Sequence, residues 1–173
     1  MDVPQIQIVD SPEILERVCR FRYQTYIEEL GTAYGQVELT DKMLKDELDE
    51  FGITMYAEYE GEIIGTARLN FGCHGEFDDY WIECYDLGVF PEIKNICLGS
   101  KMMISPKWRK TKLSTMFLAQ GFRLCKKYQA DFFFLDCIPP LVRIYEKIGF
   151  RRYKEKCSRR CQPKILCSNG RHH

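Results

Sequence analysis

The feature that most constrains the fold is a helical pattern enclosed by two strongly apolar segments. The first segment is "ICLGSKMMI" (96–104) and the second is "DFFFLDCI" (131–138). Both are short and apolar, as buried strands are, whereas residues 112–130 repeat apolar side chains every three or four positions. Two strands joined by a helix run parallel, so the pattern predicts a right-handed crossover and a sheet of the mixed α/β (α+β) class.

The rest of the chain extends this predicted sheet and places helices beside it. The other expected elements, in chain order, are a strand at 5–9, a helix from Asp10 or Ser11 to Gly31, a hairpin at 53–71 turning at Glu60-Gly61, a helix at 139–150, and strands at 151–156 and 163–167. We expect one domain over 1–157, with a central mixed β-sheet flanked by helices, and a C-terminal strand and tail over 158–173. No segment is long and apolar enough to span a membrane and none reads as a leader, so we expect a cytoplasmic protein.

The charges balance in number but separate along the chain. Lys and Arg total 25, as do Asp and Glu. Residues 28–62 carry eleven acids against two lysines, whereas every charged residue in 93–130 is Lys or Arg. A stretch of one sign that long indicates an anionic partner, and the alternative is a solvated surface.

The nine cysteines are interpreted as reduced thiols, because we find no secretion signal. Cys157, Cys161 and Cys167 lie near His172 and His173, a combination that could ligate zinc. The spacing is irregular and contains no CxxC pair, so we assign no metal site.

The segment "SPKWRKTKLS" (105–114) places four cations directly before the predicted helix and contains no glycine. Free amides at a helix N-terminus attract phosphate, so the segment could hold a phosphate, a nucleic acid or nothing. Trp108 is its one aromatic residue, which argues against single-stranded nucleic acid, because that ligand stacks on several aromatic rings.

This order of elements resembles the GNAT acyltransferases. Their loop after the central strand is Pro-x-Tyr-Arg-Gly-x-Gly-x-Gly/Ala; here Arg109 keeps its place, and Lys112 and Ser114 replace the two later glycines. The segment "YEKIGF" (145–150) is similar to the family's last helix, where Tyr145 would be the general acid that serves the departing thiolate. The resemblance implies a set of donor-binding residues: Met103, Ile104, Arg109, Lys110, Thr111, Lys112, Leu113 and Ser114.

The first half resembles a narrower group, the acyl-homoserine-lactone synthases and the N-acyl amino acid synthases. The similar segments are "FRYQTYIEELG" (21–31), "DELDEF" (46–51) and "EIIGTARLNF" (62–71). They carry the group's two arginines and two aspartates, which are Arg22, Asp46, Asp49 and Arg68. This set could bind an amino acid acceptor, with carboxylates for its ammonium and arginine for its carboxylate, or it could be a structural ion-pair network.

One departure from that group concerns the general base. The group carries Glu-x-x-Arg on the central strand, where this chain has Leu98 and Lys101. The remaining candidates are Glu83, which we assign, Asp46, and a water molecule held by backbone carbonyls beside Gly99.

The resemblance and the loop together imply the reaction. Without glycines the loop suits one phosphate presented from outside, as on the phosphopantetheine of acyl carrier protein, better than a wrapped coenzyme A diphosphate. We therefore expect a fatty acyl group to move from acyl carrier protein to the amine of an amino acid, with no permanently bound cofactor. The alternatives are an N-acetyltransferase that uses acetyl-CoA and an inactive GNAT-like binding domain. Four side chains could line the acyl cavity or simply fill the core: Met102, Met103, Met116 and Phe117.

Overall fold

The computed structural model describes residues 4–31, 40–90, 92–154 and 164–168. The strands are β1 (Ile6–Ile8), β2 (Ile53–Tyr59), β3 (Glu62–Phe71), β4 (Ile96–Ile104), β5 (Phe132–Asp136), β6 (Arg151–Lys154) and β7 (Lys164–Ser168). The α-helices are α1 (Pro12–Tyr23), α2 (Asp79–Tyr85), α3 (Leu113–Lys127) and α4 (Pro139–Glu146). A π-helical segment, η1 (Gln24–Glu29), continues α1, and short 3₁₀ turns include η3 (Glu47–Asp49) and η6 (Pro106–Trp108).

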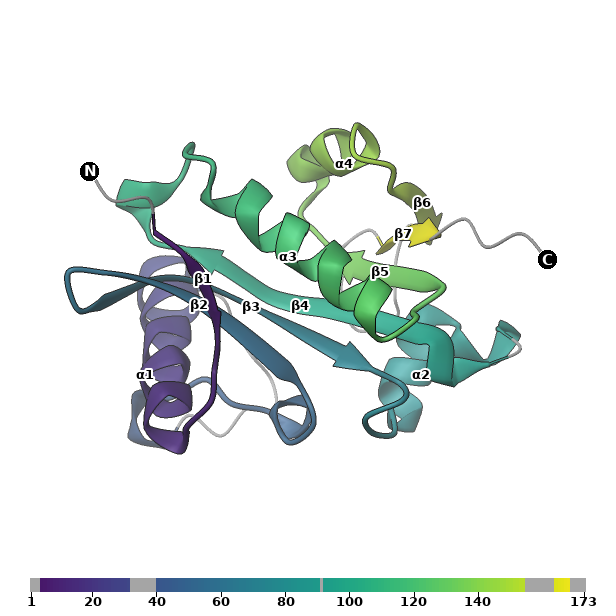
Figure 1. Ribbon diagram of the computed structural model, residues 1–173, viewed down its shortest axis with the longest axis horizontal. Helices are drawn as coiled ribbons and strands as arrows, with labels where there is room; N and C mark the ends of the chain where they lie inside the picture. The colour runs from purple at the N-terminus through teal and green to yellow at the C-terminus, as the bar shows by residue number, and fades with distance from the viewer. Residues whose placement is uncertain (1–3, 32–39, 91, 155–163, 169–173) are drawn as a thin grey trace. The chain divides into compact units, whose positions relative to one another are not determined.

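The strands form one mixed sheet in the order β1-β2-β3-β4-β5-β7-β6 (Figure 1). The pair β4/β5 is parallel and is joined through α3, which confirms the predicted crossover and the mixed α/β class. The pairs β1/β2, β5/β7 and β6/β7 are antiparallel. The C-terminal strand β7 pairs with both β5 and β6, although the sequence places it beyond the predicted domain. The boundary predicted at 157 lies outside the described residues.

The chain divides into two compact units. The first combines Met1–Arg68 with Lys101–Gly121, and the second combines Leu69–Ser100 with Phe122–His173. Strands β3 and β4 and helix α3 therefore each contribute one part to each of the two units.

In the first unit, α1 packs on the strands through both apolar and charged contacts. Ser11 caps the helix by accepting a hydrogen bond from the Ile14 amide, and Pro12 occupies its first turn. Farther along, Arg17 pairs with Glu58 of β2 at 2.9 Å.

The beginning of α3 approaches β3 closely, because a Cβ atom on Gly65 would lie 2.9 Å from the Phe117 ring. That contact is possible only while residue 65 has no side chain.

The core of the second unit is largely aromatic. Phe133 of β5 contacts the rings of Phe122 and Phe150, with centroid separations of 5.7 and 5.4 Å. Strand β4 lies close to this cluster, since a Cβ atom on Gly99 would come within 2.7 Å of the Phe133 ring. The ladder between β4 and β5 ends there, at the pair Gly99–Leu135.

Among the helices of the described residues, none has the length and apolarity needed to cross a bilayer.

Candidate active site

The four predicted substrate-binding residues meet in one chain of ion pairs within the first unit. Arg22 of α1 donates to Asp49 Oδ1 at 2.8 Å and to Thr54 Oγ1 at 3.2 Å. The other Asp49 oxygen lies 2.8 Å from Arg68 Nη1, and that same nitrogen reaches Asp46 Oδ1 at 2.5 Å. The network thus links α1, the η3 turn and β3 and brings the four residues together.

The local fold of residues 46–49 explains why both aspartates point into the network. Asp46 precedes the short η3 helix, and its backbone amide donates to Asp49 Oδ2 at 3.1 Å. Contacts of this kind, between a side chain and the backbone at a helix start, fix the direction of the side chain. Gly52 follows closely, and a Cβ atom there would lie 2.8 Å from the Arg68 side chain.

Lys101 is a fifth member of the network that the sequence analysis did not assign. Its Nζ lies 2.8 Å from Asp46 Oδ2, and the side chain is only 3% exposed. The signal was present, because Lys101 stands where the related synthases carry arginine. Its φ of +54° places it in the left-handed region, which is unusual inside a strand and indicates an irregularity of β4 at this residue.

Burial and charge act in opposite directions on the two carboxyl groups. Burial alone would raise the pKa of Asp46, but the charges of Arg68 and Lys101 and their hydrogen bonds lower it far below its usual range. The pKa of Asp49 is lowered likewise, because Arg22 and Arg68 outweigh its burial. Asp46 therefore stays ionised and is a poor proton acceptor, which removes support for it as the general base.

The network is largely closed to a ligand. The side chains of Arg22, Arg68 and Asp49 are 0% exposed, and Asp46 is 8% exposed. Three cations face two carboxylates, which leaves one net positive charge, and Arg22 Nε is buried without a hydrogen-bond partner. A small acceptor could reach these residues only at Asp46, so the geometry favours the structural alternative.

The basic loop, residues 105–114, is anchored to β2 in the first unit and is held by hydrogen bonds of its own. The Trp108 ring packs against Tyr59 with a centroid separation of 5.0 Å, and Thr111 bridges the turn by donating to Trp108 O and accepting from Leu113 N. Lys110 has a φ of +68°, a conformation that glycine adopts without strain. At residue 110 the loop thus has a backbone conformation typical of glycine, but the residue is a lysine.

Arg109, which the sequence predicts to hold the donor phosphate, already has an acidic partner. Its two terminal guanidinium nitrogens donate to the Glu29 carboxylate at 2.5 and 2.9 Å, and its Nε donates to the Ile104 carbonyl at 2.9 Å. Lys107, Lys110 and Lys112 are exposed. The predicted donor-binding residue Met103 is instead buried in a core cluster with Phe21 and Leu44.

The predicted general acid, Tyr145, is buried in the second unit. Its ring packs edge-on against Phe150 at 5.6 Å. Burial, reinforced by Cys137 and Asp136, raises the pKa of the Tyr145 phenol to about 12, so the hydroxyl keeps its proton at neutral pH. Glu83 lies on the exposed side of α2, also in the second unit.

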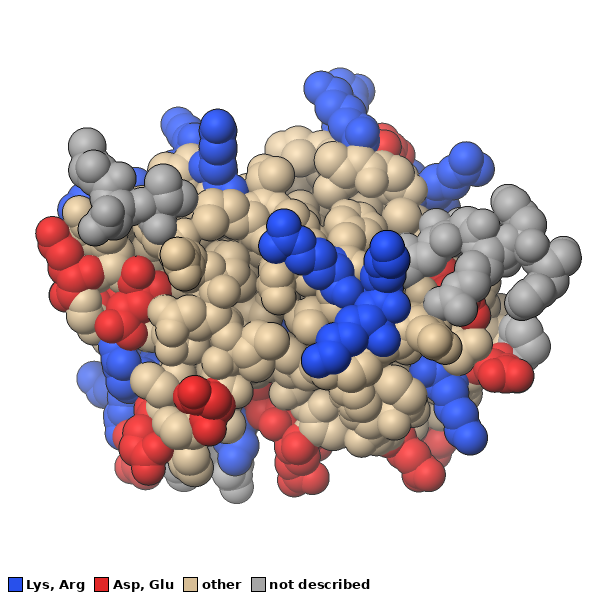
Figure 2. Space-filling view, in the orientation of Figure 1, with Lys and Arg blue, Asp and Glu red and all other residues tan. Residues whose placement is uncertain are grey.

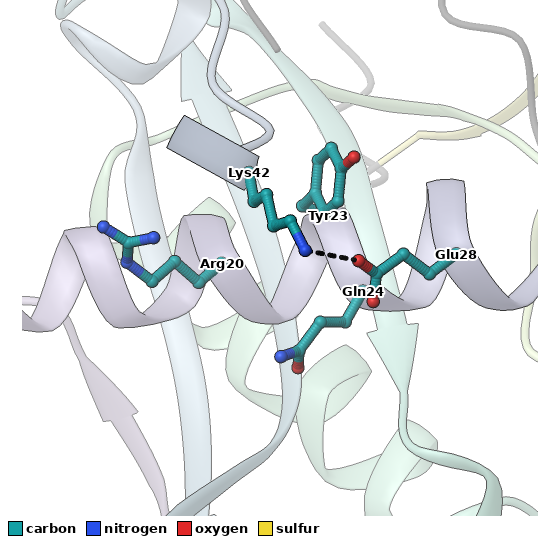
Figure 3. A pocket seen from close by; sticks show the side chains of 5 residues that line it. All are labelled: Arg20, Tyr23, Gln24, Glu28 and Lys42. Atoms are coloured by element: carbon teal, nitrogen blue, oxygen red, sulfur yellow. Dashed lines mark ion pairs between the residues drawn. The ribbon is translucent and has the colours of Figure 1, made fainter. Parts of the chain in front are cut away.

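A hollow of about 170 Å³ lies on the first unit (Figure 3). Arg20, Tyr23, Gln24, Glu28 and Lys42 line it, and Lys42 Nζ lies 3.8 Å from Glu28 Oε1. A polar lining of this kind does not suit an acyl chain. Phe117, predicted to line an acyl cavity, is packed in the core and only 1% exposed.

Within the ranges that the structure describes, no three His, Cys, Asp or Glu side chains are placed to hold a metal ion. The possible zinc cluster includes Cys157, Cys161, His172 and His173, which lie outside the described residues.

Comparison with solved structures assigns the fold to a known class. The acyl-homoserine-lactone synthase BjaI, described as CoA-dependent, is 14% identical, with 98% of this chain and 85% of BjaI covered at a TM-score of 0.78. The acyl-homoserine-lactone synthase LasI is 13% identical, with 97% and 91% covered and a TM-score of 0.71. A GNAT acetyltransferase from Staphylococcus aureus Mu50 is 17% identical, with 94% and 98% covered and a TM-score of 0.64. These similarities assign the chain to the GNAT fold.

A sequence-family model narrows this class. The model of the N-acyl amino acid synthase FeeM matches residues 17–165, and the chain belongs to that family of N-acyltransferases. No curated protein matches the chain.

Proposed function

We propose that the protein transfers a fatty acyl group from acyl carrier protein to the amine of an amino acid. Family membership supports the transfer of an acyl group to nitrogen. The observation that carries the donor assignment is the basic loop, which presents Lys107, Lys110 and Lys112 to solvent without any glycine. Lysines act as point charges for a phosphate, whereas side chains in this loop hinder the close backbone approach that wraps a diphosphate, even though Lys110 has the φ of a glycine.

The reaction is an aminolysis of a thioester. The free amine attacks the thioester carbonyl carbon, a C–N bond forms, the C–S bond breaks, and the electron pair leaves on sulfur. The amine loses one proton, for which Glu83 or an ordered water is the proposed acceptor. The departing thiolate receives one proton and becomes the free thiol of the carrier.

Tyr145 is the proposed group that faces the leaving thiolate. A free thiol has a pKa of about 8.5, which lies below the pKa of about 12 for Tyr145. Complete proton transfer from the phenol is therefore uphill. Tyr145 then acts mainly by donating a hydrogen bond to the developing thiolate, and solvent supplies the final proton.

The outer face of α4, in the same unit as Tyr145, supports a protein donor. Val142 and Tyr145 are buried, whereas an apolar strip on and next to the helix is exposed: Ile138, Leu141, Ile144 and Ile148. Exposed cations lie next to these residues in the sequence: Arg143, Lys147, Arg151 and Arg152, of which Arg152 pairs with Glu146 at 3.5 Å. Figure 2 shows blue side chains over α4 and over the second half of α3. An apolar strip with a basic rim fits an acidic protein that carries an apolar contact surface.

The donor assignment predicts a preference that salt weakens. At low ionic strength the specificity constant should be higher for acyl carrier protein than for acyl-CoA of the same chain length, and the ratio should fall as salt rises. Surface charges are screened within about 8 Å at physiological ionic strength. Lys107→Glu should slow use of the carrier protein more than use of acyl-CoA, because charges at the edge of an interface act mainly on association.

The matched control for this experiment is Lys45→Glu, which makes the same charge change at an exposed lysine in the acidic segment. It should leave the ratio of the two specificity constants unchanged. Ile144→Ser should raise the Michaelis constant for the carrier protein alone. Equal use of both donors at every salt concentration would contradict the assignment.

The alternative donor is an acyl-CoA. The specific observation in its favour is that the structural neighbour BjaI is described as CoA-dependent and has been crystallised with isopentyl-CoA. A preference for acyl-CoA in the same experiment would select this alternative and leave the acyltransferase class unchanged.

A further inference from the structure

The contact between Arg109 and Glu29 has the form of a ligand contact. Both nitrogens at the tip of the guanidinium face both carboxylate oxygens, at 2.5 and 2.9 Å, which is the fork geometry that arginine also offers to phosphate. The third contact, from Nε to the Ile104 carbonyl, ties the arginine stem to the end of β4. Glu29 therefore holds the side of Arg109 that would otherwise be available to a phosphate oxygen.

Backbone structure on both sides holds this pair in place. Glu29 is the last residue of the π-helical segment η1, and the following amide, of Leu30, donates to the Thr25 carbonyl five residues earlier at 3.3 Å. Such wide turns are rare and occur frequently at functional sites. On the other side, Trp108 packs on Tyr59 directly before Arg109. The carboxylate is thus presented to the loop by a fixed turn.

The charge of Glu29 acts unequally on the two kinds of donor. Coenzyme A brings a diphosphate and a further phosphate, whereas carrier-bound phosphopantetheine is linked through a single phosphodiester with one charge. Repulsion from a fixed carboxylate grows with the charge brought close to it. The pair is partly exposed, with Arg109 at 40% and Glu29 at 32%, so a ligand can compete with it at moderate cost.

We propose that Glu29 is a donor-selecting residue, whose carboxylate occupies Arg109 and disfavours coenzyme A thioesters relative to the single phosphodiester of an acyl carrier protein. This inference rests on the proposed donor. It adds the residue that sets the preference, and it makes the basic loop selective against higher anionic charge.

The test is Glu29→Gln, which keeps the side-chain size and removes the charge. The ratio of the specificity constants, carrier protein over acyl-CoA, should fall about three- to fivefold, the range expected for an exposed charge pair. The matched control is Glu28→Gln, since Glu28 lies one residue earlier and faces Lys42 rather than Arg109. It should leave the ratio within about twofold of the parent.

A binding measurement separates this inference from the proposed function. Trp108 stands beside Arg109 and reports on the loop by fluorescence, so coenzyme A and a methyl phosphodiester of phosphopantetheine, which carries one charge as the carrier-bound group does, can be titrated without turnover. Glu29→Gln should tighten coenzyme A binding about three- to fivefold and change phosphopantetheine binding less. In an Arg109→Ala background the effect of the substitution should differ from its effect in the parent, because the carboxylate acts partly by occupying the arginine. Equal changes for both ligands, or the same change in Glu28→Gln, would overturn the inference even if acyl transfer is observed.

Discussion

Replacing Tyr145 with phenylalanine is expected to lower kcat by about 10²–10³-fold, the range for loss of one hydrogen-bond donor to a developing negative charge. The substitution removes one hydroxyl and keeps the ring that packs against Phe150, so the melting temperature should change little. The pKa of about 12 keeps the phenol protonated through the neutral range. The variant's activity should therefore remain low at every pH at which the parent is active.

The control for this result is Tyr128→Phe. Tyr128 also packs against a phenylalanine, Phe71, at a centroid separation of 4.9 Å in the same unit. Tyr128→Phe also removes one hydroxyl group, and it should leave kcat unchanged. Parental turnover in Tyr145→Phe would exclude Tyr145 from the mechanism.

Asp49→Ala should destabilise the protein by about 3–5 kcal/mol, the cost of leaving a buried charge without its partner. The substitution removes both the 2.8 Å contact to Arg22 and the 2.8 Å contact to Arg68, and both arginines are fully buried. The measurement is the free energy of unfolding from urea denaturation of parent and variant. Because the network ties α1 to the strands, the loss should appear as a lower urea midpoint.

The exposed pair between Arg20 and Glu16 is the natural comparison, since Glu16→Ala should cost only about 0–1 kcal/mol. The kinetic readout separates the two roles of the network. A structural network predicts that Asp49→Ala, assayed under conditions where it is folded, keeps the parental Michaelis constant for the acceptor. An increase in that constant with unchanged stability would instead place the acceptor in the network.

The elements of the fold were predictable because their signals are local. The crossover through α3 follows from apolar strands on either side of a helical repeat, and Gly149, with a φ of +101°, follows the end of α4. The place of β7 between β5 and β6 was not predictable, because strand order depends on long-range pairing that no local pattern records.

The residues of the candidate site could be predicted from the sequence, but the contacts between their side chains could not. The motif resemblance grouped Arg22, Asp46, Asp49 and Arg68, yet spacing alone could not show that these four side chains form ion pairs with one another. Lys101 completes the network through an irregularity in β4 that lies outside strand periodicity. The partner of Arg109 was equally hidden, because Glu29 lies 80 residues away in the chain.

The most direct test of the proposed reaction is identification of the product by mass spectrometry. Purified protein is incubated with a long-chain acyl carrier protein and a mixture of amino acids, with Tyr145→Phe as the matched sample. The proposed reaction predicts that the parent forms an N-acyl amino acid with an amide bond and that the variant forms much less of it. Acetylated amines formed only from acetyl-CoA, or no acylated amine from any thioester, would contradict it.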